Sequence, residues 1–225
     1  MEFVFDARRE FGRRDDQNAI ERFALVGAVE EICHVSQMIV DAFLEAYHIR
    51  VLHKDTIYPF FADGLTAGDR FGPHIQSLVA RREGQAWAGG GDAPPEDMAG
   101  LCELATPSQV IFPNTITIFH PDYLSLITAY PTGPQTFGWT HRMLIPADKA
   151  TPDWAPHWEK TFRLIEEGVF QKEDIACAVG IQQGFASGAN THLTAGRAEQ
   201  GLGWFHADVA KRLAPTPAPA RLSRA

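Results

Sequence analysis

Residues 109–146 read QVIFPNTITIFHPDYLSLITAYPTGPQTFGWTHRMLIP. This segment is rich in Ile, Val, Thr, Phe and Tyr, and Pro-Asp and Pro-Thr-Gly-Pro sequences interrupt it, which predicts strands separated by turns. We expect three strands, at Gln109–His120, Tyr123–Pro131 and Gln135–Pro146, joined in order as an antiparallel meander. Along the third strand, bulky side chains alternate with side chains of mixed size and polarity. We therefore expect a helix to pack on the bulky face of the sheet.

Helical patterns lie on both sides of these strands in the sequence. Apolar residues recur at spacings of three and four, with capping residues and glycines at the boundaries, in five segments: Gln17–Cys33, the segment from Ser36 onward, Pro152–Glu167, Lys172–Ser187 and Ala195–Leu213. A further strand is expected at Pro73–Arg82, whereas Lys54–Arg70 and Gly84–Pro95 have the glycine and proline content of loops. The sequence therefore predicts an α+β fold in which helices flank an antiparallel sheet.

The 225 residues contain no internal repeat and no break in composition, and they suffice for a real core and an enclosed pocket. We expect one domain at residues 17–213, preceded by a charged lead-in segment at residues 1–16. A proline-rich tail at residues 214–225 is expected to be disordered.

Charge and apolar content restrict the partners. The net charge is −8, from 20 Lys and Arg against 28 Asp and Glu, which disfavours a nucleic-acid partner. No apolar stretch approaches the roughly 20 residues of a membrane span, and the N-terminus lacks a secretory signal pattern, so we expect a cytoplasmic protein. The three cysteines form no CxxC or CxH pair, which argues against a disulfide framework or a thiolate metal site.

Residues 41–53, DAFLEAYHIRVLH, place acidic residues and two histidines on an otherwise apolar helix. His48 and His53 would point about 140° apart on an unbroken helix, so a shared metal requires the helix to end just after His48. A carboxylate with two histidines makes the facial triad that binds Fe(II) and leaves positions open for O₂ and substrate. Glu45, one turn before His48, could be that ligand or could orient the imidazole. Two ordinary core histidines remain the alternative.

Residues 41–57, DAFLEAYHIRVLHKDTI, resemble the mononuclear-iron segment of the Rieske-type aromatic-ring-hydroxylating oxygenase α subunits, in which a carboxylate precedes HxxxxH by three residues. Residues 110–116, 131–134 and 173–187 resemble the same catalytic domain in the same order. The resemblance covers roughly residues 36–213 and implies a helix-grip (START/Bet v 1-like) fold, a curved antiparallel sheet holding a long helix.

The resemblance also implies roles for individual residues. The family's Fe(II) ligands correspond to His48, His53 and Asp174, and Glu45 corresponds to the carboxylate that carries electrons from a neighbouring subunit's Rieske cluster. Without the resemblance, Asp174 is an acidic residue in the first turn of a helix, where the helix dipole favours it.

The chain departs from the family because it lacks the CxH and CxxH pairs that hold a [2Fe–2S] Rieske centre. That cluster is expected only on a separate chain or a missing domain. Three interpretations remain open: a fragment of a longer protein, a subunit served by another Rieske protein, or a domain that has lost redox chemistry.

The leading hypothesis is O₂-dependent hydroxylation of an aromatic or other small organic substrate, with electrons from a Rieske or ferredoxin-type donor. The resemblance suggests a homotrimer. Aromatic residues predicted to contact substrate are Phe112, Phe119, Trp139 and Phe185. The alternatives are a helix-grip module that binds small molecules without turnover and, last, a zinc hydrolase that uses the same ligands but lacks an HExxH base.

Overall fold

The computed structural model describes residues 34–88, 95–133, 136–189 and 194–213. The predicted lead-in segment, the predicted helix Gln17–Cys33 and the predicted tail lie outside the described residues. No helix of the described part of the chain is long and apolar enough to cross a membrane.

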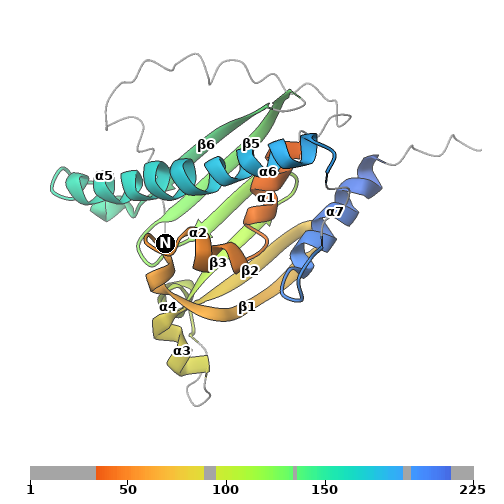
Figure 1. The fold of residues 1–225 in the computed structure, drawn as a ribbon. Helices are drawn as coiled ribbons and strands as arrows, with labels where there is room; N and C mark the ends of the chain where they lie inside the picture. The colour runs from red at the N-terminus through yellow and green to blue at the C-terminus, as the bar shows by residue number, and fades with distance from the viewer. Residues whose placement is uncertain (1–33, 89–94, 134–135, 190–193, 214–225) are drawn as a thin grey trace, which may run out of the picture.

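Six antiparallel strands form one sheet in the order of the sequence (Figure 1). The strands are β1 (Phe61–Phe71), β2 (His74–Arg81), β3 (Ala105–Ile111), β4 (Thr115–Phe119), β5 (Leu124–Gly133) and β6 (Thr136–Leu144). The predicted meander is confirmed for β5 and β6. The predicted single strand Gln109–His120 is wrong, because a turn at Pro113 and Asn114 divides it into β3 and β4. Asn114 supports that turn by donating a side-chain hydrogen bond of 3.0 Å to the Ala129 carbonyl of β5.

Helices cover one face of the sheet, as expected from the bulky side chains on one face of the third predicted strand (Figure 1). They are α1 (His34–Ala42), α2 (Tyr47–Leu52), α3 (Arg82–Ala88), α4 (Met98–Leu104), α5 (Ala155–Arg163), α6 (Ala176–Ala186) and α7 (Gln200–Leu213), with short 3₁₀ turns η2 (Tyr58–Phe60) and η3 (Ala147–Lys149). Helix α1 packs on β5, β6 and α6, and α7 packs on β1 and β2.

The predicted break between two helices near Gly168 is wrong. A π-helical segment, η4 (Leu164–Ile175), joins α5 to α6, so one helical run extends from Ala155 to Ala186. Wider turns of this kind occur preferentially at functional sites. Here η4 brings buried Val169, Phe170 and Asp174 over the sheet.

Two predicted loops contain regular structure. Lys54–Arg70 includes most of β1, whose sequence FADGLTAGDRF has little β propensity, and antiparallel pairing with β2 along its length overrides that local preference. Gly84–Pro95 begins inside α3, and residues 89–94 lie outside the described residues. The predicted strand Pro73–Arg82 matches β2.

The core lies between the sheet and the long helical run. Ile116, Ile127 and Met143 from three neighbouring strands are almost completely buried, and they pack in one cluster with Val169 and Phe170 of η4. This packing fixes η4 against the sheet and so sets the position of Asp174.

Candidate metal centre and cavity

His48 and His53 come from α2 and the residue directly after it. The predicted helix end just after His48 is wrong, because α2 continues to Leu52 and the distortion falls on His53. His53 has φ −99° and ψ 21°, away from helical values, although its backbone N–H still donates to the Ile49 carbonyl at 3.2 Å. The two imidazoles therefore face one another, with ring centroids 5.1 Å apart.

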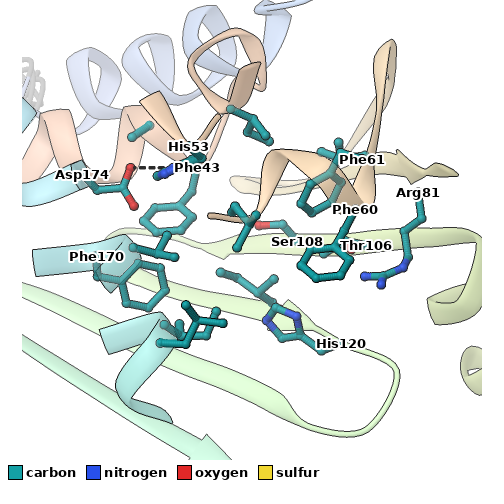
Figure 2. Close-up of a pocket in the computed structure, with 18 of the residues that line it drawn as sticks. Phe43, His53, Phe60, Phe61, Arg81, Thr106, Ser108, His120, Phe170 and Asp174 are labelled. Carbon is teal, nitrogen blue, oxygen red and sulfur yellow. Dashed lines mark ion pairs between the residues drawn. The ribbon is translucent and has the colours of Figure 1, made fainter. Parts of the chain in front are cut away.

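Asp174 brings a third donor atom from η4. Its Oδ1 lies 3.1 Å from His53 Nε2 and 3.8 Å from His48 Nε2, and Figure 2 shows the His53–Asp174 pair at one end of the cavity. The three residues offer donor atoms that all lie within 4.8 Å of one another. Two donors about 2.1 Å from one metal, at right angles, are about 3.0 Å apart, so this spacing suits a metal ion.

The buried oxygen of Asp174 tests whether a metal fits. Among the described residues, Asp174 Oδ1 has no hydrogen-bond partner of suitable geometry, despite its closeness to His53. A buried carboxylate oxygen without a partner is costly unless a cation satisfies it. Two imidazoles and one carboxylate are the donor set of the open Fe(II) facial triad, and Zn(II) accepts the same atoms.

Two further carboxylates hold the other nitrogen of each imidazole. His48 Nδ1 hydrogen-bonds to Glu45, and His53 Nδ1 lies 2.7 Å from Glu173 Oε2. Thr56 fixes Glu173 by donating a hydrogen bond of 2.8 Å to the same oxygen. With Nδ1–H donated to a carboxylate, each histidine presents an unprotonated Nε2 toward Asp174, which is the usual arrangement around a metal-binding histidine.

The charges at this site favour a cation. Burial lowers the pKa of His53, but the neighbouring carboxylates of Asp174 and Glu173 outweigh that effect, and the net pKa lies above its ordinary value. The centre thus attracts positive charge, which a metal ion would supply.

A cavity of about 280 Å³ extends from the three donors into the fold. Its walls are mostly apolar. In Figure 2, Phe43 and Phe170 lie close to His53 and Asp174, whereas Phe60 lies beside Arg81 at the far end. A partly apolar pocket of this kind, with a few polar groups, suits a small organic ligand.

The family model for the ring hydroxylating alpha subunit (catalytic domain) matches residues 38–215. The chain belongs to this family. No curated protein matches the sequence.

Solved structures of Rieske oxygenases share the fold. The quaternary ammonium Rieske monooxygenase CntA with an inhibitor has 17% identity over 78% of this chain and 45% of its own, with a TM-score of 0.59. Naphthalene 1,2-dioxygenase from Rhodococcus sp., bound to indole, has 16% identity over 81% and 54%, with a TM-score of 0.56. Dicamba monooxygenase with 3,6-dichlorosalicylic acid has 10% identity over 78% and 54%, with a TM-score of 0.52.

This chain therefore spans about half the length of these solved chains. The family match and the arrangement of sheet and helices confirm the expected helix-grip α+β fold.

The four aromatic residues predicted to contact substrate are not among the residues that line the described cavity, so their contact with substrate stays a prediction. Phe112 packs on Phe205, with ring centroids 5.6 Å apart, and Trp139 lies one layer behind the wall formed by Phe43 and Phe170.

The other two aromatic residues, Phe119 and Phe185, lie away from the cavity because of their positions on β4 and α6. On β4 the side chain of Ile118 lines the cavity, so the next residue, Phe119, points to the opposite face. Phe185 belongs to α6, beyond the part of the helical run that reaches the cavity. The aromatic side chains that line the cavity instead include Phe43 and Phe60.

The sequence interpretation missed two groups of polar residues. Glu173 precedes Asp174 directly, and a pair of adjacent carboxylates, one for the metal and one for an imidazole, is a signal that could have identified it. Thr106 and Ser108 of β3 and His120, which directly follows β4, line the far end of the cavity. No local spacing links the two β3 residues to His120, because neighbouring strands bring them together.

Proposed function

We propose that this chain is the mononuclear-iron catalytic domain of a Rieske-type oxygenase, in which His48, His53 and Asp174 hold Fe(II). The reaction is O₂-dependent hydroxylation of a small, mainly apolar organic substrate. The observation that carries the proposal is the approach of two imidazole nitrogens to a buried Asp174 oxygen that lacks a hydrogen-bond partner among the described residues. Bound Fe(II) supplies the redox chemistry with O₂ and leaves coordination positions open.

The protein contributes orientation. Glu45 and Glu173 each accept a hydrogen bond from the Nδ1–H of one imidazole, so that both Nε2 atoms remain available as ligands. The apolar cavity wall around Phe43 and Phe170 excludes water and holds the substrate carbon beside the donors.

Glu45 also has the position that an electron route requires. It borders the substrate cavity on one side and a second hollow on the other, which is lined by Tyr47, Arg197 and Trp204 among others. Electrons from a Rieske or ferredoxin-type donor, on another chain or domain, would enter through this second hollow and reach His48 by way of Glu45. A homotrimer, in which one subunit's donor serves the next, is the assembly that this route suggests.

Turnover with labelled oxygen tests the proposal. Iron-loaded protein is incubated under ¹⁸O₂ with NADH, a reductase, a Rieske ferredoxin and a panel of single-ring aromatic compounds. We expect ¹⁸O in a hydroxylated product only when the Rieske protein is present. Labelled product with the reductase alone would contradict the electron route, and no product with any donor would favour a binding module without turnover.

A further inference from the structure

Three neighbouring strands present polar side chains to the end of the cavity away from the metal donors. The register pairs Val79 of β2 with Thr106 of β3, and Ser108 of β3 with Ile118 of β4. His120 follows Ile118 by two residues and therefore lies on the same face of the sheet. All five residues line the cavity.

Three polar atoms at this end lack partners. Among the described residues, Thr106 Oγ1, Ser108 Oγ and His120 Nε2 are buried and have no hydrogen-bond partner. Buried polar groups in proteins are nearly always hydrogen-bonded, so three such atoms on one cavity wall indicate a ligand or ordered water. Burial lowers the pKa of His120 to about 3, with a further contribution from the charge of Arg81, so this imidazole is neutral.

A largely buried cation completes the group. Arg81 lines the same end of the cavity, and its side chain is only 17% exposed. Its ionic contact is with Glu83, whose carboxylate is 4.0 Å from Arg81 Nε and is 66% exposed, which makes this a weak pair. The other nearby carboxylate, Asp122, faces His157 at 3.4 Å.

Figure 2 places the guanidinium of Arg81 beside Phe60 and above His120, across the cavity from Asp174 and His53. Carboxylates lie at the metal end and Arg81 lies at the far end, and the carboxylate of Asp122, which also lines the cavity, is paired with His157. An anionic ligand is repelled by the carboxylates of the metal end and attracted by Arg81.

We propose that Arg81, Thr106, Ser108 and His120 form a binding site for the carboxylate of a small aromatic acid, whose ring extends toward the metal donors. A guanidinium can bind a carboxylate through two parallel hydrogen bonds, and the hydroxyls supply further donors. This inference rests on the proposed function, because the ring would be hydroxylated at the metal end only if the three donors hold iron. A cavity of about 150 Å³ holds benzene, so about 280 Å³ suits one ring with a carboxylate.

The test measures binding to metal-free protein, so that a carboxylate cannot bind through the metal. Sodium benzoate and benzamide, which have the same ring but differ in charge, are titrated by calorimetry. We expect benzoate to bind at least about tenfold more tightly than benzamide, and Arg81→Gln to abolish that preference. Arg82→Gln is the matched control, because Arg82 is the next residue, is exposed and lies outside the cavity lining; it should leave both affinities unchanged.

Circular dichroism establishes that each variant is folded. If Arg81→Gln fails to fold, Arg81→Lys takes its place. It should weaken benzoate binding, because lysine keeps the charge but cannot make the bidentate hydrogen bonds of a guanidinium. Equal affinity of folded wild type for benzoate and benzamide, or a preference that survives Arg81→Gln, would overturn the proposal.

The same preparations are tested for Fe(II) binding, which separates this inference from the proposed function. A benzoate preference without Fe(II) binding would refute the iron assignment and leave the carboxylate site in place. Fe(II) binding without a benzoate preference would overturn the carboxylate site alone.

Discussion

The two ends of the cavity differ in how their polar groups are satisfied. At the metal end, the Nδ1 atoms of His48 and His53 each have a carboxylate partner, and one oxygen of Asp174 is left for a cation. At the far end, Thr106 and other polar groups have no partner among the described residues. The comparison supports the proposal that the first end binds a metal and the second binds a polar group of a ligand.

Among substitutions of residues that are not themselves proposed ligands, the largest expected effect is on Fe(II) affinity, from loss of the Glu173 carboxylate that holds His53. Glu173→Gln removes the negative charge beside His53 Nδ1, and we expect Fe(II) affinity to fall about 10- to 100-fold, as for other partners of metal-binding histidines. The measurement is anaerobic equilibrium dialysis against Fe(II).

Glu166→Gln is the matched control, because Glu166 makes the same kind of contact with His141, at 2.9 Å, on the same η4 segment. It should leave Fe(II) affinity within about twofold of wild type. Equal losses in the two variants would mean that Glu173 acts through stability alone.

The same Glu166–His141 pair gives a pH prediction. Burial raises the pKa of Glu166, but hydrogen bonds from His141 and Gln171 outweigh this, so the folded pKa lies below the ordinary value of 4.5. A lowered carboxyl pKa stabilises the fold above the unfolded value, and the contribution is lost as pH falls through the folded pKa.

At pH 7, Glu166→Gln should lower the free energy of unfolding of metal-free protein by about 1–2 kcal/mol, measured in urea. The difference from wild type should shrink as the pH falls below about 4.5. A difference that stays constant from pH 7 to pH 3 would contradict the assigned ionic contact.

A smaller effect of opposite sign is expected at the far end. Thr106→Val keeps the side-chain volume and removes an unsatisfied hydroxyl, so the free energy of unfolding of ligand-free protein should rise by about 1 kcal/mol while benzoate binds more weakly. Thr117→Val is the control, because Thr117 donates to Gln109 at 3.3 Å and its loss should lower stability. If both variants lose stability equally in urea titrations, the Thr106 hydroxyl has a partner after all.

The smallest effect concerns the cavity wall. Phe43 lines the cavity, so Phe43→Leu should weaken benzoate binding about twofold to tenfold. Phe112 packs on Phe205 outside the lining, and Phe112→Leu should leave benzoate affinity unchanged in the same calorimetric titration. The reverse result would place the ligand outside this cavity.

The comparison also explains what the sequence could predict. Residues 41–53 carry the two histidines and Glu45 within one short segment, so spacing and resemblance could predict the proposed metal end. The strands β5 and β6 are rich in β-branched and aromatic residues between turn residues and were predicted correctly. Strand β1 was not, because its glycines and aspartates form a strand only through pairing with β2.

The far end could not be predicted for the same physical reason. Arg81 and Thr106 come from β2 and β3, and His120 directly follows β4, so only the register of the sheet brings them to one cavity wall. The break predicted near Gly168 failed because tertiary packing of η4 against the core, and not local glycine content, decides the course of that helical run.

The most direct test of the central claim is the iron content of anaerobically reconstituted protein, measured by plasma mass spectrometry. The account predicts close to one Fe(II) per chain in wild type and almost none in folded His48→Ala and Asp174→Ala variants, while His74→Ala, an exposed histidine outside the centre, keeps full occupancy. A folded wild-type protein that binds no iron, or an Asp174→Ala variant that binds as much as wild type, would contradict it.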